Sequence, residues 1–479
     1  MKRFSLFVAM LLVACTQPSY PGIDRPSGGG NSATDQSIID YIDLRLENEY
    51  YWLDEVGAKC NTFNRSVAWE NYLSQTLSRL ESNTDDGYVN SKGQRVFYSY
   101  IREYESSTRA SVSGFGVELH YTIVVIDNDL RNYGFLVESV YPNSPAAEAG
   151  VKRGDIITMI GGSYITPENY ATRFTSIQEN TASALKLKLK RQTGDKETFD
   201  VELTKGAYAK TPVVYNDIIE IEGYDKKIGY LVYTGFESEY DDELLGVLGE
   251  FAAEGVGEVI LDLRCNGGGS VASAVKLCSA LVPASYEGGL LCQITRNPKN
   301  TKNDTTQQFK LVNTSNQLAN LERLTVICSD YSASASELVI MGLRGLDFPV
   351  TLVGSTTEGK NCGMDVTRTT IANTDVTVEY APITFMCFDA KGYGDWGEGI
   401  TPDVDLTNEA NEFGLSDKNY PLPRADWGDQ SHDIALVTAL AKVTGRNIST
   451  SATRSEVGFE ELETTAISRP VVGVRNYVE

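Results

Sequence analysis

The sequence has few residues of the kinds that hold metal ions or contact nucleic acid. Only two histidines, His120 and His432, occur among 479 residues, and the eight cysteines show no CxxC pair or Cys/His spacing of a zinc site. Basic residues are also scarce, because 42 Lys and Arg stand against 65 Asp and Glu, a formal net charge of −23. A protein that binds a phosphate backbone needs the opposite charge, so we expect no nucleic-acid partner.

Long apolar runs are absent too, and the longest one lies at the N-terminus. Residues 4–14 are apolar and follow Lys2 and Arg3, which is the pattern of a secretory signal too short to span a bilayer. The run ends in Leu-Val-Ala-Cys, which resembles a bacterial lipobox. That resemblance implies removal of the signal peptide, residues 1–14, and lipidation of Cys15. An ordinary signal peptide followed by an incidental cysteine is the alternative.

The composition of the segment after this cysteine bears on the location of the protein. Residues 15–35 are rich in Pro, Gly and Ser, which is typical of a flexible tether. We therefore expect a lipid-anchored protein of the cell envelope. By analogy to sorting rules in some bacteria, Thr16 does not indicate retention in the inner membrane, which favours the outer membrane of a bacterium with two membranes.

Helical periodicity predicts a helical N-terminal region over residues 36–110. Two stripes of apolar side chains recur at three- and four-residue intervals, and we expect both to form core. The first stripe is Ile38, Ile42, Leu46, Tyr50 and Leu53, and the second is Trp69, Leu73, Leu77 and Leu80.

Residues 112–206 change to strand-like patterns. Ser144 followed by Pro145, with Gly150 at the end, predicts one short capped helix. Alternation over residues 185–190 and the matching segment 199–203 predicts a hairpin with one solvated face. Together with Ser-Gly-Phe-Gly-Val at 113–117 and Lys-Arg-Gly-Asp at 152–155, this region resembles a PDZ domain of the type found in bacterial proteases.

The resemblance to PDZ domains implies a peptide-binding site. In such domains, backbone amides of the Gly-Phe-Gly loop receive the C-terminal carboxylate of a peptide, which adds to the sheet as a strand. The corresponding residues here are Gly114, Phe115, Gly116 and Val117.

Strands and helices alternate over residues 208–450, which predicts an α/β domain with its site near the strand ends. Residues 228–233, 258–263, 324–328 and 350–353 have the patterns of buried strands. Residues 451–479 form a C-terminal extension. The fold class we expect is therefore multidomain α/β: a helical N-terminal region, a β-rich PDZ-like domain and an α/β core.

Three segments of the last region could carry chemistry. Ser334 and Glu337 form a capping box where a buried strand meets a helix, so amides at that helix start could stabilise an oxyanion. A plain helix cap is the simpler alternative. Glycines at 267–269 follow another strand and could supply further amides. No motif places a histidine beside the serine. Lys360, after the next strand, is a candidate base, and a solvated surface charge is the simpler alternative for an isolated lysine.

As an ordered set, these segments resemble the carboxyl-terminal processing proteases, also called tail-specific proteases. The matching motifs are Asp-Leu-Arg-Cys-Asn-Gly-Gly-Gly at 262–269, Ser-Ala-Ser-Ala-Ser-Glu at 332–337, Gly-Lys at 359–360, and the segment 396–404. The resemblance implies a crotonase-like catalytic core, a Ser334 nucleophile, a Lys360 general base, and oxyanion amides at Gly268 and Ala335. It further implies cleavage of polypeptides near their free C-termini, with no metal or organic cofactor.

The sequence also departs from that family. Many members carry a glutamine four residues after the lysine, where this chain has Met364. The third catalytic residue is thus unassigned, and a weakly active or inactive envelope scaffold that binds peptides or small apolar ligands is the alternative function. Ser273 and Lys276 form a rival S-x-x-K pair, which we interpret as a chance spacing because no K-T-G follows.

Overall fold

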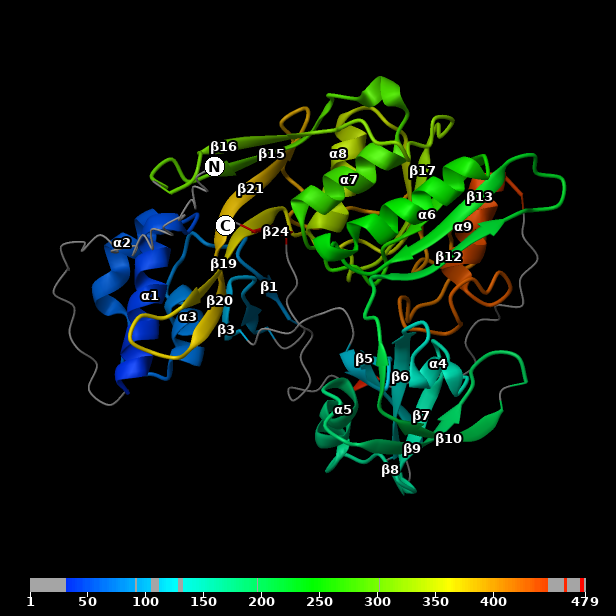
Figure 1. Ribbon diagram of the computed structural model, residues 1–479, viewed down its shortest axis with the longest axis horizontal. Coiled ribbons are helices and arrows are strands. Elements are labelled where there is room, and N and C mark those ends of the chain that lie inside the picture. Colours follow the sequence, from blue (N-terminus) through cyan, green and yellow to red (C-terminus); the bar gives the residue numbers. More distant parts are fainter. Residues whose placement is uncertain are drawn as a thin grey trace, which may run out of the picture.

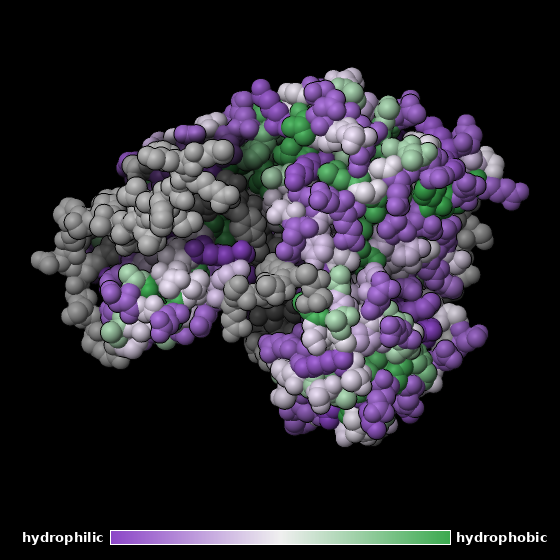
Figure 2. All heavy atoms as spheres, in the orientation of Figure 1, coloured by the Kyte–Doolittle hydropathy of each residue, from purple (hydrophilic) through white to green (hydrophobic). Residues whose placement is uncertain are grey.

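The computed structural model describes residues 32–90, 93–104, 112–127, 132–195, 197–300, 302–446, 461–462 and 474–477. The signal peptide, Cys15 and nearly all of the tether lie outside the described residues, as does most of the C-terminal extension. Figure 1 shows three regions: N-terminal helices on one side, a β-rich domain at the bottom, and a larger α/β core beside and above them. The expected mixed α/β fold class is confirmed. Figure 2 shows hydrophilic side chains over much of the same face, as the net charge of −23 leads us to expect.

The N-terminal region begins with helices and ends in strands. Its elements are α1 (Ala33–Glu49), α2 (Leu53–Lys59), α3 (Trp69–Leu77), β1 (Tyr88–Val89), β2 (Arg95–Val96) and β3 (Tyr100–Glu103). Every residue of the first predicted stripe is buried. The helix stops at Glu49, however, because Tyr51 donates its amide to the carbonyl of Ile383 across 2.8 Å. The expectation of helix up to residue 110 is wrong for the three strands.

A mixed sheet carries the helices of this region on one face. Its strands are β15 (Leu290–Arg296), β16 (Thr306–Lys310), β19 (Cys362–Thr370), β20 (Thr377–Ala381), β21 (Ile383–Asp389), β24 (Val474–Tyr477) and β3. β3 pairs with β20, and β24 pairs with β19. The apolar sides of α1 to α3 share one core with Cys362, Met364 and Val366 of β19. The N-terminal region therefore covers the strand that follows Lys360.

The β-rich domain is built around one sheet with the order β10-β9-β7-β6-β5-β23. Its elements are β4 (Val112–Gly114), β5 (Val117–Asp127), β6 (Asn132–Val140), α4 (Pro145–Glu148), β7 (Ile156–Ile160), β8 (Ser163–Tyr164), α5 (Tyr170–Gln178), β9 (Ala184–Lys190), β10 (Thr198–Thr204), β11 (Gly206–Tyr208) and β23 (Glu461–Leu462). The predicted cap and hairpin are both present. The Ser144 hydroxyl accepts the amide of Ala147 at 3.3 Å, and Leu187 lies opposite Val201.

The core domain is a six-stranded sheet between two layers of helices. Its elements are β12 (Val213–Ile219), β13 (Lys227–Tyr233), α6 (Asp241–Ala253), β14 (Val256–Asp262), α7 (Val271–Leu281), β17 (Leu324–Cys328), α8 (Ala335–Gly345), β18 (Val350–Gly354), β22 (Val404–Asp405) and α9 (Ile434–Thr444). The strand order is β12-β13-β14-β17-β18-β22, and all neighbours except β12 are parallel. Alternate residues face opposite layers: Leu231 and Leu261 pack toward α6 to α8, whereas Tyr230 and Ile260 pack toward α9.

Candidate active site

Three loops meet at one edge of the core sheet. The glycine-rich turn follows β14, the serine segment follows β17, and the loop with Lys360 follows β18. Because these three strands are adjacent and parallel, their carboxyl ends lie at the same edge. Strand order alone therefore brings together residues that are far apart in the sequence.

Ser334 occupies the N-cap of α8 with a strained backbone. Its φ is 64° and its ψ is −109°, a conformation that non-glycine residues rarely adopt. Such strain costs about 1–3 kcal/mol and is found most often at functional sites. The neighbouring serines have structural roles, because the hydroxyl of Ser332 donates to the carbonyl of Leu263 and that of Ser336 donates to the carbonyl of Asn266, each at 2.8 Å.

The carboxylate of Glu337 links the serine to the lysine loop. One oxygen accepts the amides of Ser334 and Lys360, both at 2.8 Å, and the other accepts the amide of Gly359 and the hydroxyl of Thr357. Burial raises the pKa of Glu337 to about 7, although these four donors favour the charged form. From sequence, Glu337 was predicted only as a helix cap, and its contacts across the sheet edge were missed.

Lys360 lies just before β19, and only 1% of its surface is exposed. Its ammonium nitrogen lies 4.2 Å from the centroid of the Tyr98 ring, which belongs to the N-terminal region. Met364, where the resemblance to the family leads us to expect glutamine, is fully buried in the core shared by β19 and the N-terminal helices.

Gly268 lies against the proposed nucleophile. A Cβ at this position would lie 2.9 Å from Cβ of Ser334 and 3.0 Å from the amide nitrogen of Ala335, so only glycine permits this approach. Ala335 is the first residue of α8, where helix amides lack intrahelical partners. In this structure, however, the amide of Gly268 donates to Oδ1 of Asn266 at 2.9 Å. Asn266 lies in the motif at 262–269, but the sequence analysis assigned it no role of its own.

The predicted peptide-binding residues lie where β4 ends and β5 begins in the β-rich domain. They are not part of the three loops that meet at Ser334. Gly116 has φ of +77°, and a Cβ there would lie 2.0 Å from Cβ of Ser144. The amide of Phe115 donates to Oδ1 of Asn180 at 3.0 Å. Gly114 pairs with Gly206, and Val117 begins β5.

The free edge of β5, where a peptide would add, is partly occupied by the chain itself. Gln178 at the end of α5 accepts the amide of Leu119 at 2.8 Å. Farther along, β23 pairs antiparallel with β5, and Leu462 lies opposite Ile123. A peptide that covered the whole of this edge would compete with these contacts.

One cavity of about 760 Å³ joins the three regions. It is bounded by Ala333 and residues 267–269 of the core, by Glu118 and His120 of the β-rich domain, and by Tyr98 of the N-terminal region. The cavity therefore reaches from the residues that flank Ser334 to the beginning of β5. It is large enough for several side chains of a peptide.

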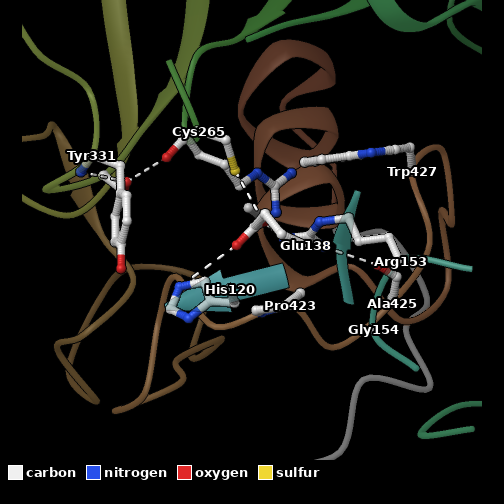
Figure 3. Close-up of polar contacts among 12 residues, drawn as sticks. His120, Glu138, Arg153, Gly154, Cys265, Tyr331, Pro423, Ala425 and Trp427 are labelled. Carbon is white, nitrogen blue, oxygen red and sulfur yellow. Dashed lines mark hydrogen bonds and ion pairs between the residues drawn. The ribbon is translucent and has the colours of Figure 1, made fainter. Parts of the chain in front are cut away.

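Each histidine has a carboxylate neighbour outside the three loops that meet at the sheet edge. His120 is buried in the contact between the β-rich domain and the core, where its Nε2 lies 3.5 Å from Oε2 of Glu138 and its ring lies 5.4 Å from that of Tyr331 (Figure 3). Glu138 also accepts a hydrogen bond from the thiol of Cys265 at 3.1 Å. His432 lies 2.9 Å from Asp429.

The other candidates from the sequence have structural surroundings. Lys276, of the rival S-x-x-K pair, forms an ion pair with Asp241 at 2.6 Å. Seven cysteines are described, all as free thiols, and five of them are buried. Among the residues that the structure describes, no group of His, Cys, Asp and Glu side chains is arranged to hold a metal ion.

Comparison with known proteins agrees with this geometry. The pattern of peptidase family S41 matches residues 227–406, and that of the PDZ domain matches residues 136–191. Residues 227–406 form a peptidase family S41 domain. The family expected from the motifs is confirmed, and the chain carries the catalytic domain of a family of serine peptidases.

The relatives of this chain are distant. A CtpA-like serine protease of Staphylococcus epidermidis is 24% identical over 70% of this chain and 62% of that protein. Another of the same description, from Staphylococcus haemolyticus, is 22% identical over 95% of this chain and 82% of that protein. A solved structure from Bacteroides fragilis, assigned to the S41 proteases, has a TM-score of 0.63 at 23% identity and covers 85% of this chain and 97% of that one. At this identity the structural likeness shows a shared fold.

Proposed function

We propose that this chain is a serine endopeptidase that cleaves polypeptides near their C-termini, with Ser334 as nucleophile and Lys360 as general base. The observation that carries the proposal is the buried carboxylate of Glu337, which holds the backbone amides of both residues on one oxygen. The strained backbone of Ser334 supports it, since the hydroxyls of the two adjacent serines are committed to carbonyls. The S41 match supplies the reaction class.

In the first step, the hydroxyl oxygen of Ser334 attacks the scissile carbonyl carbon and its proton passes to the amine of Lys360. The carbonyl oxygen becomes an oxyanion that accepts hydrogen bonds from the amides of Ala335 and Gly268. Gly268 can contribute only after its amide leaves Asn266 or is shared with it. The lysine then protonates the leaving amine, and a water molecule repeats the sequence on the acyl-enzyme.

The PDZ domain suggests how a substrate is selected. A polypeptide with a free C-terminus would place its carboxylate at residues 114–117 and add a strand to β5. The shared cavity between this edge and the residues beside Ser334 gives such a chain a route to the nucleophile. The description of relatives as CtpA-like serine proteases favours this role.

A lipid anchor at Cys15 is proposed from the sequence. Within the described residues, no helix combines the length and apolar character that a bilayer crossing requires. Attachment through the acylated cysteine and the tether would place the peptidase in the cell envelope, in the outer membrane of a bacterium with two membranes.

A fluorophosphonate probe tests the proposed function, because it forms a covalent bond with an activated serine. We expect labelling of the wild-type chain at Ser334 and none of Ser334→Ala. Ser273→Ala is the matched control, since Ser273 is also a buried serine but lies on α7 beside the paired Lys276, and it should be labelled like the wild type. Equal labelling of Ser334→Ala and wild type would leave the alternative, a peptide-binding scaffold.

A further inference from the structure

We propose that Tyr98, in the N-terminal region, is a positioning residue for Lys360. The inference rests on the proposed function, because it concerns the base of that reaction. It adds a residue outside the S41-matched segment to the catalytic machinery.

The contact between Tyr98 and the lysine is close and buried. The Lys360 ammonium lies 4.2 Å from the centroid of the Tyr98 ring, and the two residues are 1% and 4% exposed. An aromatic face attracts a cation at this distance, and more strongly where water is excluded. The hydroxyl of the same ring donates to Oε1 of Glu358 at 3.0 Å. The hydroxyl of Tyr98 therefore binds the loop that carries Lys360, and the face of its ring contacts the lysine itself.

The backbone beside Tyr98 is fixed independently of the lysine. Asp86, which is fully buried, accepts the amide of Ser99 at 2.9 Å and its hydroxyl at 2.6 Å. The same hydroxyl accepts the amide of Ile383 in β21 at 2.9 Å, and Tyr50 donates to Asp86 at 2.7 Å. These bonds hold the loop between β2 and β3 against the sheet. The Tyr98 ring is therefore placed by the N-terminal region before any substrate binds.

Charged and titratable groups on every side of the lysine act with the ring. Glu358 lies on the loop of the lysine and Glu337 on α8. The others are Asp86 and Tyr98 from the N-terminal region, and Cys362 and Cys387 from the sheet. Burial raises the pKa of Asp86, while hydrogen bonds and the charge of Lys360 act in the opposite direction. The aromatic face stabilises the ammonium without a charge of its own, and burial raises the pKa of the Tyr98 hydroxyl far above neutral pH.

The test is the pH dependence of fluorophosphonate labelling in Tyr98→Leu and Tyr98→Phe. Labelling rises with pH as the lysine loses its proton. Leucine still fills the apolar space beside the lysine but lacks the aromatic face that favours the protonated form, so Tyr98→Leu should move the midpoint of this rise to lower pH by about 0.4–1.5 units. It should also lower the plateau rate by about 10- to 100-fold, since the amine is no longer held toward the serine. Tyr98→Phe keeps the ring and should retain the wild-type midpoint.

Thermal unfolding separates positioning from a structural role. A merely structural tyrosine would lower the melting temperature in both variants and leave the midpoint unchanged, and that result would overturn the inference. Tyr98→Met, which fills the space with a flexible side chain, replaces Tyr98→Leu if the latter does not fold. If wild-type Ser334 is labelled and these variants behave like wild type, only the role of Tyr98 is wrong. If Ser334 is never labelled, the proposed function fails and this inference falls with it.

Discussion

Replacing Glu337 with glutamine tests the electrostatics of the site most directly. The folded pKa of this carboxyl is about 7, against an ordinary value of 4.5, so the folded chain keeps a proton over a pH range in which the unfolded chain has lost it. Its stabilising contribution is complete below pH 4.5 and is lost as pH rises through 7. At ~1.4 kcal/mol per pKa unit, this loss is about 3 kcal/mol.

Urea unfolding of wild type and Glu337→Gln at pH 4, 6 and 8 measures this effect. The glutamine does not titrate, so the free energy of unfolding of wild type relative to the variant should fall by about 3 kcal/mol between pH 4 and pH 8. Glu254→Gln is the control, because Glu254 is exposed and Lys227 lowers its pKa, which gives a small dependence of opposite sign. A difference for Glu337→Gln that is independent of pH would refute the reasoning.

Three other changes test the remaining parts of the proposal. Lys360→Met removes the base and should slow fluorophosphonate labelling of Ser334 by about 10²- to 10⁴-fold at unchanged melting temperature, and wild-type labelling would move the base elsewhere. Gly116→Ala places a Cβ 2.0 Å from Cβ of Ser144 at a positive φ, so a free-acid peptide should bind about 10- to 100-fold more weakly in a fluorescence titration, while an amidated peptide should bind weakly to both proteins. Cys15→Ser should move the protein from the membrane pellet to the soluble fraction on cell fractionation, and retention in the pellet would count against a lipid anchor.

The core domain was the most predictable part of the fold. Its buried strands are apolar runs of five to seven residues, and they alternate with helices, so both patterns are local. The parallel order then places the glycine turn, the serine segment and the lysine loop at one edge. The cap at Ser144 was predictable for the same reason, because a capping serine and a proline at the first helical position act within one turn.

Contacts between distant segments were not predictable from such patterns. Glu337 has the spacing of a helix cap, yet its bonds to Gly359 and Lys360 join two loops after different strands. Tyr98 lies in a stretch without helical or alternating pattern, and nothing local relates it to a lysine more than 250 residues away. The hydrogen bond from the amide of Gly268 to Asn266 joins residues that are close in the sequence, but it depends on the conformation of one turn.

These contacts connect the N-terminal region to the surroundings of Lys360. The S41 match covers residues 227–406, but the lysine of that segment is buried partly by Tyr98, and the strand after it shares a core with α1 to α3. Without residues 33–103, Met364 and Val366 would expose apolar surface, and water would reach the ammonium. Water screens the charges around an amine and solvates its protonated form, so a lysine in that state is a poor base at neutral pH. In the proposed mechanism, the N-terminal region therefore helps to keep the base buried, although it lies outside the segment that matches the family.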